Sequence, residues 1–319
     1  MPRSEKPWLE VAVNGSWTRK VQPGRPITVD EIVRESVECA KLGASVSRVP
    51  PCSRLRSSPP TPLLSPLCAE LIIHMHAYDA AWGVQKDDPD LYAAIFRGII
   101  SQVDCICYPT VPTGARRFEA VQDLARRGAL EWCTLDPGSC NYERNLRQMV
   151  AEERLWNEDH IKDAYKMCFD HRIHPSFAIY EPGLLRAGSV WQAHHPQAPI
   201  PIYRFMLSSR YLWSFPPKPY ALHAYTSLLA DEAPGMPWMV AGLDVDVTPL
   251  VEETVNAGGH VRVGLEDAPM GTKMSNVEWT KVAVEKIQNA GKKLATAKEV
   301  RADLKEMEME YRSRKGARI

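Results

Sequence analysis

Residues 238–267 read WMVAGLDVDVTPLVEETVNAGGHVRVGLED, and this stretch decides the fold. Two short apolar runs, at 238–244 and 260–267, flank an amphipathic segment that begins with Thr248-Pro249 and ends before two glycines. Proline is favoured at the first position of a helix and glycine just after its end. The stretch therefore predicts a strand, a helix and a second strand, which is the repeating unit of a parallel sheet.

The same alternation continues along the rest of the chain. Six further apolar runs are predicted as strands, most of them apolar on both faces as buried parallel strands are; they cover 9–15, 71–79, 104–111, 130–136, 175–181 and 200–207. Helices are predicted at 28–43, 89–101, 116–127, 156–173, 219–233, 248–257, 275–291 and 296–314. Eight strands alternating with about eight helices favour a single (β/α)8 TIM-type barrel over residues 1–319, with a C-terminal helical extension at 295–319.

One segment departs from this pattern. Residues 46–70 are rich in Pro, Ser and Arg and have neither helical nor strand periodicity. They lie between a predicted helix and a predicted strand, where about 2–6 residues normally suffice. Two interpretations stay open: a surface insertion on the N-terminal face of the barrel, or a stretch never selected as protein, such as an intron translated in frame. Both interpretations predict that the segment is poorly ordered.

Composition excludes several classes of protein. Lys plus Arg equals Asp plus Glu at 39 each, whereas nucleic-acid and polybasic membrane-surface proteins carry a basic surplus. No apolar run approaches the roughly 18 residues of a membrane-spanning helix, and no apolar stretch follows the N-terminal charges as in a secretory signal. The eight cysteines contain no Cys-x-x-Cys pair, which favours reduced thiols. The sequence predicts a soluble cytoplasmic protein.

The triplet His74-Met75-His76 lies in the second predicted strand. Residues two apart on a strand point to the same face, so both imidazoles project together. Near the C-terminal end of a barrel strand, that face lines the active-site mouth. Two imidazoles on one face are half of a common transition-metal site. The alternative is one histidine in the core and the other at the surface.

A second charged group lies on the eighth predicted strand, which contains Arg262, Glu266 and Asp267. Such residues on an apolar strand are costly to bury without partners or a function. Strands eight and two are alternate strands of a barrel and contribute to the same interior layer, so Glu266 can meet both histidines. Two imidazoles, one carboxylate and an open position suit catalytic zinc, with Fe(II) or Mn(II) as alternatives. A structural ion pair is the other interpretation.

Together these motifs and others resemble the β-keto acid cleavage enzyme family. The resemblance covers nearly the whole chain except 46–70, and it is carried by VAVNGSW (11–17), HMHAYD (74–79), CTLDPGS (133–139), FAIYEPG (177–183) and GGHVRVGLED (258–267). It implies a zinc-dependent barrel that condenses a β-keto acid with acetyl-CoA and releases acetoacetate and a new acyl-CoA.

The resemblance also implies roles for individual residues. It makes Asp267 the catalytic base and Arg262 the residue that holds and tunes it. It makes Thr134 a residue that positions the substrate. The implied zinc ligands are His74, His76 and Glu266.

Three positions depart from the family pattern, and we expect them to line the substrate site. Trp17 stands near the position where aminohexanoate-cleaving members have a glutamate that holds the substrate ammonium. Tyr78 replaces the usual arginine of the His-x-His-x-Arg-Asp motif, and Thr110 follows a proline at the family's serine position. An indole gives an ammonium no ion pair, so the sequence predicts a substrate with a neutral or apolar tail.

Two other functions stay open at this point. A metal-dependent barrel hydrolase would also use His-x-His, although such barrels carry further His and Asp ligands that are not evident in this chain. A non-catalytic paralogue would result if the 46–70 segment displaced the second strand. For the favoured enzyme we expect a β-keto acid and acetyl-CoA as small-molecule partners, a homo-oligomer (a tetramer or dimer), and neither nucleic acid nor membrane.

Overall fold

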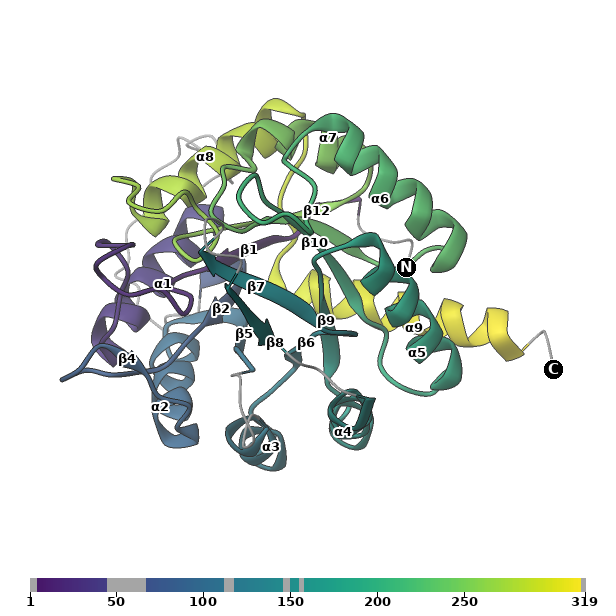
Figure 1. Ribbon diagram of the computed structural model, residues 1–319, viewed down its shortest axis with the longest axis horizontal. Coiled ribbons are helices and arrows are strands. Elements are labelled where there is room, and N and C mark those ends of the chain that lie inside the picture. Colours follow the sequence, from purple (N-terminus) through teal and green to yellow (C-terminus); the bar gives the residue numbers. More distant parts are fainter. Residues whose placement is uncertain (1–4, 45–66, 112–117, 146–149, 155–157, 317–319) are drawn as a thin grey trace, which may run out of the picture.

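The computed structural model describes residues 5–44, 67–111, 118–145, 150–154 and 158–316. Eight parallel strands form one sheet in the order β5-β2-β1-β12-β11-β10-β9-β6, curved into a nearly closed barrel that helices surround (Figure 1). The predicted TIM-type barrel is confirmed. Its strands are β1 (Leu9–Ala12), β2 (Leu67–Met75), β5 (Val103–Pro109), β6 (Trp132–Leu135), β9 (His174–Ile179), β10 (Ile202–Leu207), β11 (Trp238–Gly242) and β12 (His260–Val263).

The helices around the barrel include all eight that the sequence predicts. They are α1 (Val29–Ala44), α2 (Pro89–Ile100), α3 (Glu119–Arg126), α4 (Glu158–His171), α6 (Pro219–Glu232), α7 (Val251–Asn256, after a 3-10 turn at Thr248–Leu250), α8 (Asn276–Asn289) and α9 (Ala297–Gly316). A further helix, α5 (Pro182–His194), was not predicted. Its glycines lower its helix propensity, but Gly188 has a packing reason, since a Cβ there would lie 2.9 Å from the Phe177 ring.

Two predicted capping boxes begin helices as expected. Ser275 Oγ accepts the Glu278 N–H while the Glu278 carboxylate accepts the Ser275 N–H at 2.7 Å, and this fixes the start of α8. Thr28 and Glu31 make the same reciprocal pair at 3.0–3.1 Å before α1. These contacts satisfy backbone donors that a helix start otherwise leaves free.

Strand β2 differs from its predicted extent. It begins at Leu67 rather than Leu71, because Leu67 pairs with Val103 of β5 before a register shift between Cys68 and Ile72. The last residues of the predicted insertion therefore belong to the sheet. The rest of that segment, residues 46–66, lies outside the described residues, and so does the prediction about its order.

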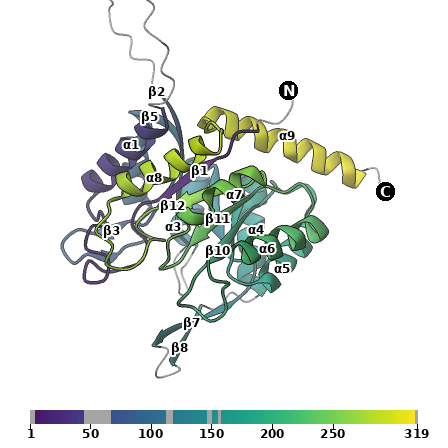
Figure 2. The same ribbon diagram turned by 90° about the horizontal axis from the view of Figure 1, so that it is seen from above.

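Two antiparallel hairpins were not predicted. One, β3 (Tyr78–Asp79) with β4 (Val84–Gln85), follows β2 at the C-terminal end of the barrel. The other, β7 (Cys140–Asn145) with β8 (Val150–Arg154), follows β6 and projects away from the barrel (Figure 2). Both hairpins lie where the sequence predicted short strand-to-helix connections, so the loops at the C-terminal end of the barrel are longer than predicted.

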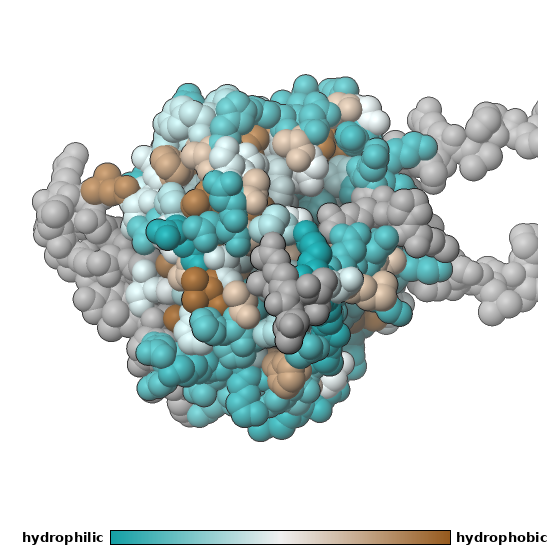
Figure 3. All heavy atoms as spheres, turned by 90° about the vertical axis from the view of Figure 1, so that its right-hand side faces the viewer, coloured by the Kyte–Doolittle hydropathy of each residue, from teal (hydrophilic) through white to brown (hydrophobic). Residues whose placement is uncertain are grey.

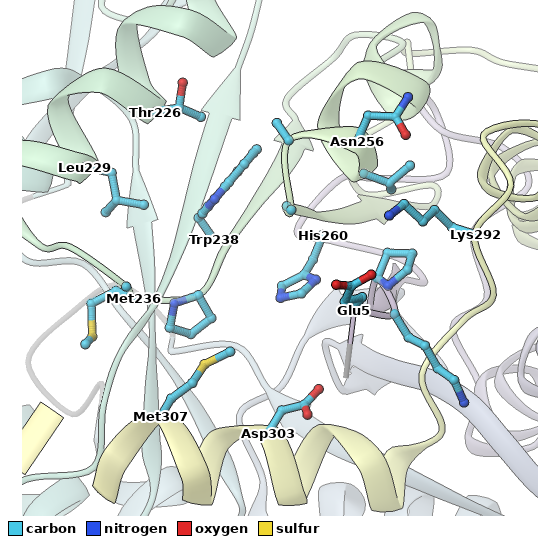
Figure 4. A pocket seen from close by; sticks show the side chains of 18 of the residues that line it. Glu5, Thr226, Leu229, Met236, Trp238, Asn256, His260, Lys292, Asp303 and Met307 are labelled. Atoms are coloured by element: carbon cyan, nitrogen blue, oxygen red, sulfur yellow. The ribbon is translucent and has the colours of Figure 1, made fainter. Parts of the chain in front are cut away.

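Helix α9 lies across the N-terminal ends of the strands. Arg301 bonds Asp104 at 2.8 Å and Glu131 at 2.6 Å, and Trp8 Nε1 donates to Asp303 at 3.2 Å. A cavity of about 800 Å³ lies beside it, where Trp238 and His260 from the starts of β11 and β12 face the same hollow as Asp303 (Figure 4). This hollow lies at the end of the barrel associated with stability rather than with catalysis.

The molecular surface is mixed in character. On the face shown in Figure 3, apolar side chains form small separate groups among hydrophilic ones. The most exposed large apolar side chains are Trp82 at 81% and Leu212 at 77%. No helix in the described ranges is long and apolar enough to cross a membrane. Cys39, Cys105, Cys107, Cys133 and Cys168 are free and buried, as expected for reduced thiols.

Candidate active site

The two predicted histidines and the predicted glutamate meet at the C-terminal end of the barrel. His74 and His76 lie at and just beyond the end of β2, and Glu266 follows β12. His74 Nε2 lies 3.3 Å from Glu266 Oε2, and His76 Nε2 lies 3.5 Å from Glu266 Oε1. One potential ligand atom from each residue falls within 4.8 Å of the others. The sequence prediction that these side chains converge is correct.

Two glycines allow the backbone after β12 to pass close to β1. Gly264 has a φ of +131°, and a Cβ there would lie 2.3 Å from the Ala12 carbonyl oxygen. Gly15 has a φ of +65°, and its Cβ would lie 2.6 Å from Glu266 Cγ. Both conformations and both contacts require glycine. The close approach carries Glu266 across β1 to the histidines of β2.

The donor set fits a divalent transition metal. Among the described residues, His76 Nε2 and Glu266 Oε2 are buried without a hydrogen-bond partner. His76 Nδ1 lies 2.8 Å from Gln85 Oε1, a contact that fixes the ring and leaves Nε2 facing the cluster. Two imidazoles and one carboxylate are the protein ligands of many catalytic zinc sites. No other group of three or more His, Cys, Asp or Glu is close enough within the described ranges, so the further ligands expected for a hydrolase do not join this cluster.

The electrostatics of the cluster also suit metal binding. Burial holds the pKa of His74 well below its usual value, so the imidazole is neutral and can act as a ligand. Burial opposes ionisation of Glu266, but Arg262 and the two imidazoles outweigh it and hold the pKa of Glu266 well below its usual value. The cluster therefore presents the neutral imidazole of His74 and the carboxylate of Glu266.

Arg262 and Asp267 form a two-bond ion pair beside the cluster. Arg262 Nε donates to Asp267 Oδ2 at 2.9 Å, and Nη2 donates to Asp267 Oδ1 at 2.7 Å. The backbone N–H of Gly242 also donates to Oδ2, at 3.2 Å. Burial raises the pKa of Asp267 to about 6 against the opposing charge of Arg262, and the nearby Glu266 adds to the rise. The pairing that the sequence predicted is present.

Glu10 completes the surroundings of Arg262, and sequence reasoning missed it. This β1 residue is fully buried, and its Oε1 accepts hydrogen bonds from Arg262 Nη1 at 3.1 Å and from the Tyr108 hydroxyl at 2.6 Å. Carboxylate oxygens of Glu10, Glu266 and Asp267 therefore all lie within 3.1 Å of the Arg262 guanidinium. The signal in the sequence was a single acid within the apolar run LEVAV.

The two predicted threonines lie at the same end of the barrel. Thr134 is the third residue of β6, and its hydroxyl donates to the Pro109 carbonyl oxygen at 3.5 Å. Thr110 follows β5, and its backbone N–H donates to the Met75 carbonyl oxygen at 3.1 Å. Both are buried. Thr110 lies beside the end of β2, which carries the histidines, and Thr134 contacts the end of β5. Their direct contact with substrate stays a prediction.

Trp17 and Tyr78 flank the cluster from the loop after β1 and from β3. Trp17 Nε1 donates to the Glu266 carbonyl oxygen at 2.7 Å, and the Tyr78 hydroxyl donates to the Gly15 carbonyl oxygen. The guanidinium of Arg25, another residue that the sequence did not indicate, lies 4.2 Å from the centre of the Tyr78 ring. A cation from the β1–α1 loop therefore lies beside the position where the family motif usually has arginine.

Comparison with known proteins identifies the family. The model of the family described as beta-keto acid cleavage enzyme matches residues 6–49 and 71–305. The chain belongs to this family. It is accordingly an acyl-transferring enzyme, and the resemblance seen in the sequence is confirmed. The match leaves residues 50–70 unaligned, in agreement with the predicted insertion, and it favours neither of the two explanations for that segment.

Two curated relatives align along nearly their whole length. The chain is 25% identical over 308 residues to a 3-keto-5-aminohexanoate cleavage enzyme from Fusobacterium nucleatum, covering 93% of this chain and 97% of that protein. It is 25% identical over 323 residues to a 3-oxoadipate:acetyl-CoA acetyltransferase from Cupriavidus necator, covering 96% and 97%. One relative is named for the cleavage of a β-keto acid and the other for acetyl transfer between 3-oxoadipate and acetyl-CoA, so the two names leave the acid of this chain unspecified.

Solved structures confirm the fold. Apo ObcA has a TM-score of 0.62 and 13% identity, over 88% of this chain and 65% of ObcA, so the chain spans about two thirds of that protein's length. The 3-dehydroquinate dehydratase of Geobacillus kaustophilus has a TM-score of 0.51 and 10% identity, over 89% of this chain and 92% of that protein. At these identities the likeness concerns the barrel alone.

Proposed function

We propose that this enzyme is zinc-dependent and condenses a β-keto acid with acetyl-CoA, with His74, His76 and Glu266 as the metal ligands. The observation that carries the proposal is the convergence of these three side chains next to an arginine-held carboxylate. Fe(II) or Mn(II) would suit the same ligands. The chemistry that a bound divalent ion supplies there is Lewis acidity, which stabilises the negative charge of an enolate.

Asp267 is the proposed general base. Its Oδ1 accepts one hydrogen bond from the described residues and its Oδ2 accepts two, so Oδ1 is the atom that takes the proton from C2 of the β-keto acid. Arg262 orients the carboxylate with two parallel bonds and keeps it from rotating. Proton removal by a held carboxylate at this position is ordinary general-base catalysis.

The carbon–carbon steps then follow. C2 of the deprotonated acid attacks the thioester carbonyl of acetyl-CoA, a C–C bond forms, and the CoA thiolate leaves. The thiolate attacks the distal carbonyl of the resulting diketo acid, and the bond between that carbonyl carbon and C2 breaks. C2 takes up one proton, and the products are acetoacetate and a new acyl-CoA. We assign Thr134 and Thr110, at the adjacent strand ends, to positioning the substrate.

The side chain of the acid is proposed to be neutral or apolar. Trp17 is half-buried and fixed by its bond to the Glu266 carbonyl oxygen, and together with Tyr78 it presents aromatic surface to the site. A bound ammonium group would lose water there without a carboxylate from position 17. An apolar tail would gain about 25 cal/mol per Å² of buried surface.

We further propose that the enzyme works as a homo-oligomer, a dimer or tetramer, in the cytoplasm. The exposed apolar side chains of Trp82 and Val84 in the β3–β4 hairpin are candidates for burial between subunits. Light scattering after size-exclusion chromatography measures the assembly, and a monomer at micromolar concentration would contradict this part.

Carbon labelling tests the reaction. With [1-13C]acetyl-CoA and unlabelled 3-oxohexanoate, the proposed route places the label at C3 of acetoacetate and leaves the butyryl-CoA product unlabelled. A hydrolase would instead cleave the acid with water and release no labelled acetoacetate. NMR of the quenched reaction distinguishes the two, and unlabelled acetoacetate would contradict the proposed carbon–carbon bond formation.

A further inference from the structure

Glu10 occupies an unusual position for an acid. It lies inside the barrel on β1, in register with Arg262 of β12 and Ile72 of β2, and it is fully buried. Barrel interiors are normally filled by branched apolar side chains. A buried carboxylate is costly unless it is paired and hydrogen-bonded. Its partners therefore indicate why an acid is present at this position.

Both partners of Glu10 belong to the site. Oε1 accepts from Arg262 Nη1 at 3.1 Å and from the Tyr108 hydroxyl at 2.6 Å, and the Tyr108 ring lies 4.7 Å from the His74 ring. Arg262 uses Nε and Nη2 for Asp267, and Nη2 also lies 3.1 Å from Glu266 Oε1. Glu10 is thus the contact on the side of the guanidinium that does not face Asp267.

We propose that Glu10 is a positioning residue for the proton-transfer step. It holds Nη1 from within the barrel, so the guanidinium plane stays oriented to give Asp267 two bonds. Without this anchor Arg262 keeps its charge but gains freedom to tilt toward Glu266, and Asp267 loses its fixed direction. Errors of about 1 Å in the placement of a reacting group cost about 10²-fold in rate. This inference rests on the proposed role of Asp267 as the base.

Proton exchange at C2 of the β-keto acid isolates the step that Glu10 is proposed to support. In D2O without acetyl-CoA, the base removes a C2 proton and deuterium replaces it, which NMR follows against the enzyme-free rate. We expect Glu10→Gln to lower the enzyme-dependent exchange rate and kcat at least fivefold, and Glu10→Ala to lower them more. KM for the β-keto acid and the metal content should stay within twofold of wild type.

A matched control separates positioning from general destabilisation. Glu308 of α9 is also buried and also bonded by two arginines, Arg172 and Arg312, but it lies at the far end of the barrel. Glu308→Gln should lower stability and leave exchange unchanged. If Glu10→Gln does not fold, Tyr108→Phe tests the proposal instead, because this variant removes only one hydrogen bond to Glu10. We expect Tyr108→Phe to lower the enzyme-dependent exchange rate at C2 at least twofold.

Three results would overturn the proposal. They are wild-type exchange in folded, metal-loaded Glu10→Gln, wild-type exchange in the Tyr108→Phe fallback, and loss of metal on Glu10 substitution, which would make the residue part of the metal site. A different variant shows whether the proposed function itself is wrong. In that case Asp267→Asn exchanges at the wild-type rate, whatever the Glu10 variants do.

Discussion

Strand β12 carries a buried histidine at its start and, just beyond its end, a half-buried glutamate followed by a buried aspartate. The two ends differ in how their polar atoms are satisfied. His260 Nδ1 accepts the Trp8 backbone N–H at 3.1 Å, and its ring stacks on the Trp8 indole with centroids 3.9 Å apart. At the other end, Glu266 Oε2 and the facing His76 Nε2 are buried without partners among the described residues.

The contrast separates structural burial from a ligand site. A hollow of about 800 Å³ lies beside His260 (Figure 4), yet none of its lining residues has a buried side-chain atom without a partner in the described part of the chain. At the His74–His76–Glu266 cluster, by contrast, the unsatisfied atoms converge. Convergent unsatisfied atoms on rigid strands therefore identify a functional site better than the size of a cavity or the burial of a titratable group.

The largest effect on metal binding and activity is expected from substitution of Glu266, just beyond the end of β12. Glu266→Gln keeps the size of the side chain but removes the charged ligand, so we expect near-complete loss of metal. The expected fall in kcat/KM is about 10⁴-fold, which corresponds to ~5 kcal/mol of lost charge stabilisation. Elemental analysis and steady-state kinetics measure both quantities. His260→Gln is the control and should keep its metal.

Asp267→Asn should separate the base from the metal. The amide oxygen can still accept one hydrogen bond from Arg262, but the side chain cannot take a proton, so we expect kcat to fall about 10³-fold. Metal content should stay at the wild-type value. A variant that loses metal along with activity would show instead that Asp267 supports the ligands.

His260 should contribute a pH effect on stability rather than on catalysis. Burial lowers the pKa of His260 to about 3, whereas the unfolded chain takes up this proton near pH 6.5. Between these values the unfolded state binds the proton and the folded state does not, so stability falls as pH decreases. The loss by pH 4 is about 3 kcal/mol. Urea denaturation from pH 7 to 4 should show a shallower decline for His260→Gln, and equal slopes would contradict this.

Substrate preference tests the proposed contact of Trp17 and Tyr78 with the side chain of the β-keto acid. We expect kcat/KM for 3-oxohexanoate to exceed that for 5-amino-3-oxohexanoate about tenfold. This ratio corresponds to a difference of about 1.4 kcal/mol in activation free energy, the cost of leaving the ammonium group unpaired. Trp17→Glu should narrow or reverse this ratio, because it supplies a carboxylate. A wild-type preference for the amino substrate would refute the assignment of the tail and leave the metal ligands untouched.

The smallest effect is expected from removing the insertion. The sequence predicts that excision of residues 46–71 leaves or improves folding, and the start of β2 at Leu67 sharpens this prediction. Deleting 50–66 keeps all of β2, so the free energy of unfolding should change by less than about 1 kcal/mol. Deleting 50–70 also removes the pairing of Leu67 with Val103. An insoluble 50–66 deletion would show that the segment belongs to the fold.

The sequence predicted the parts of the molecule that depend on local pattern. Apolar runs predicted the strands, capping boxes predicted helix starts, and the spacing of His74 and His76 predicted two imidazoles on one face. Parts that depend on tertiary contact were missed. Helix α5 is stabilised by close packing of Gly188 on Phe177. The role of Glu10 depends on its hydrogen bond with Arg262, which the pairing of β1 with β12 brings into contact with it. No spacing along the chain encodes either contact.

Anomalous X-ray diffraction from crystals of the purified enzyme tests the central claim most directly. Data collected on both sides of the zinc absorption edge should give one strong peak per chain, about 2.0–2.2 Å from a ligand atom of His74, His76 and Glu266. The peak should vanish in Glu266→Gln crystals and remain in His260→Gln crystals. A metal peak elsewhere in the chain, or wild-type activity in crystals and solution without any metal, would contradict the proposed site.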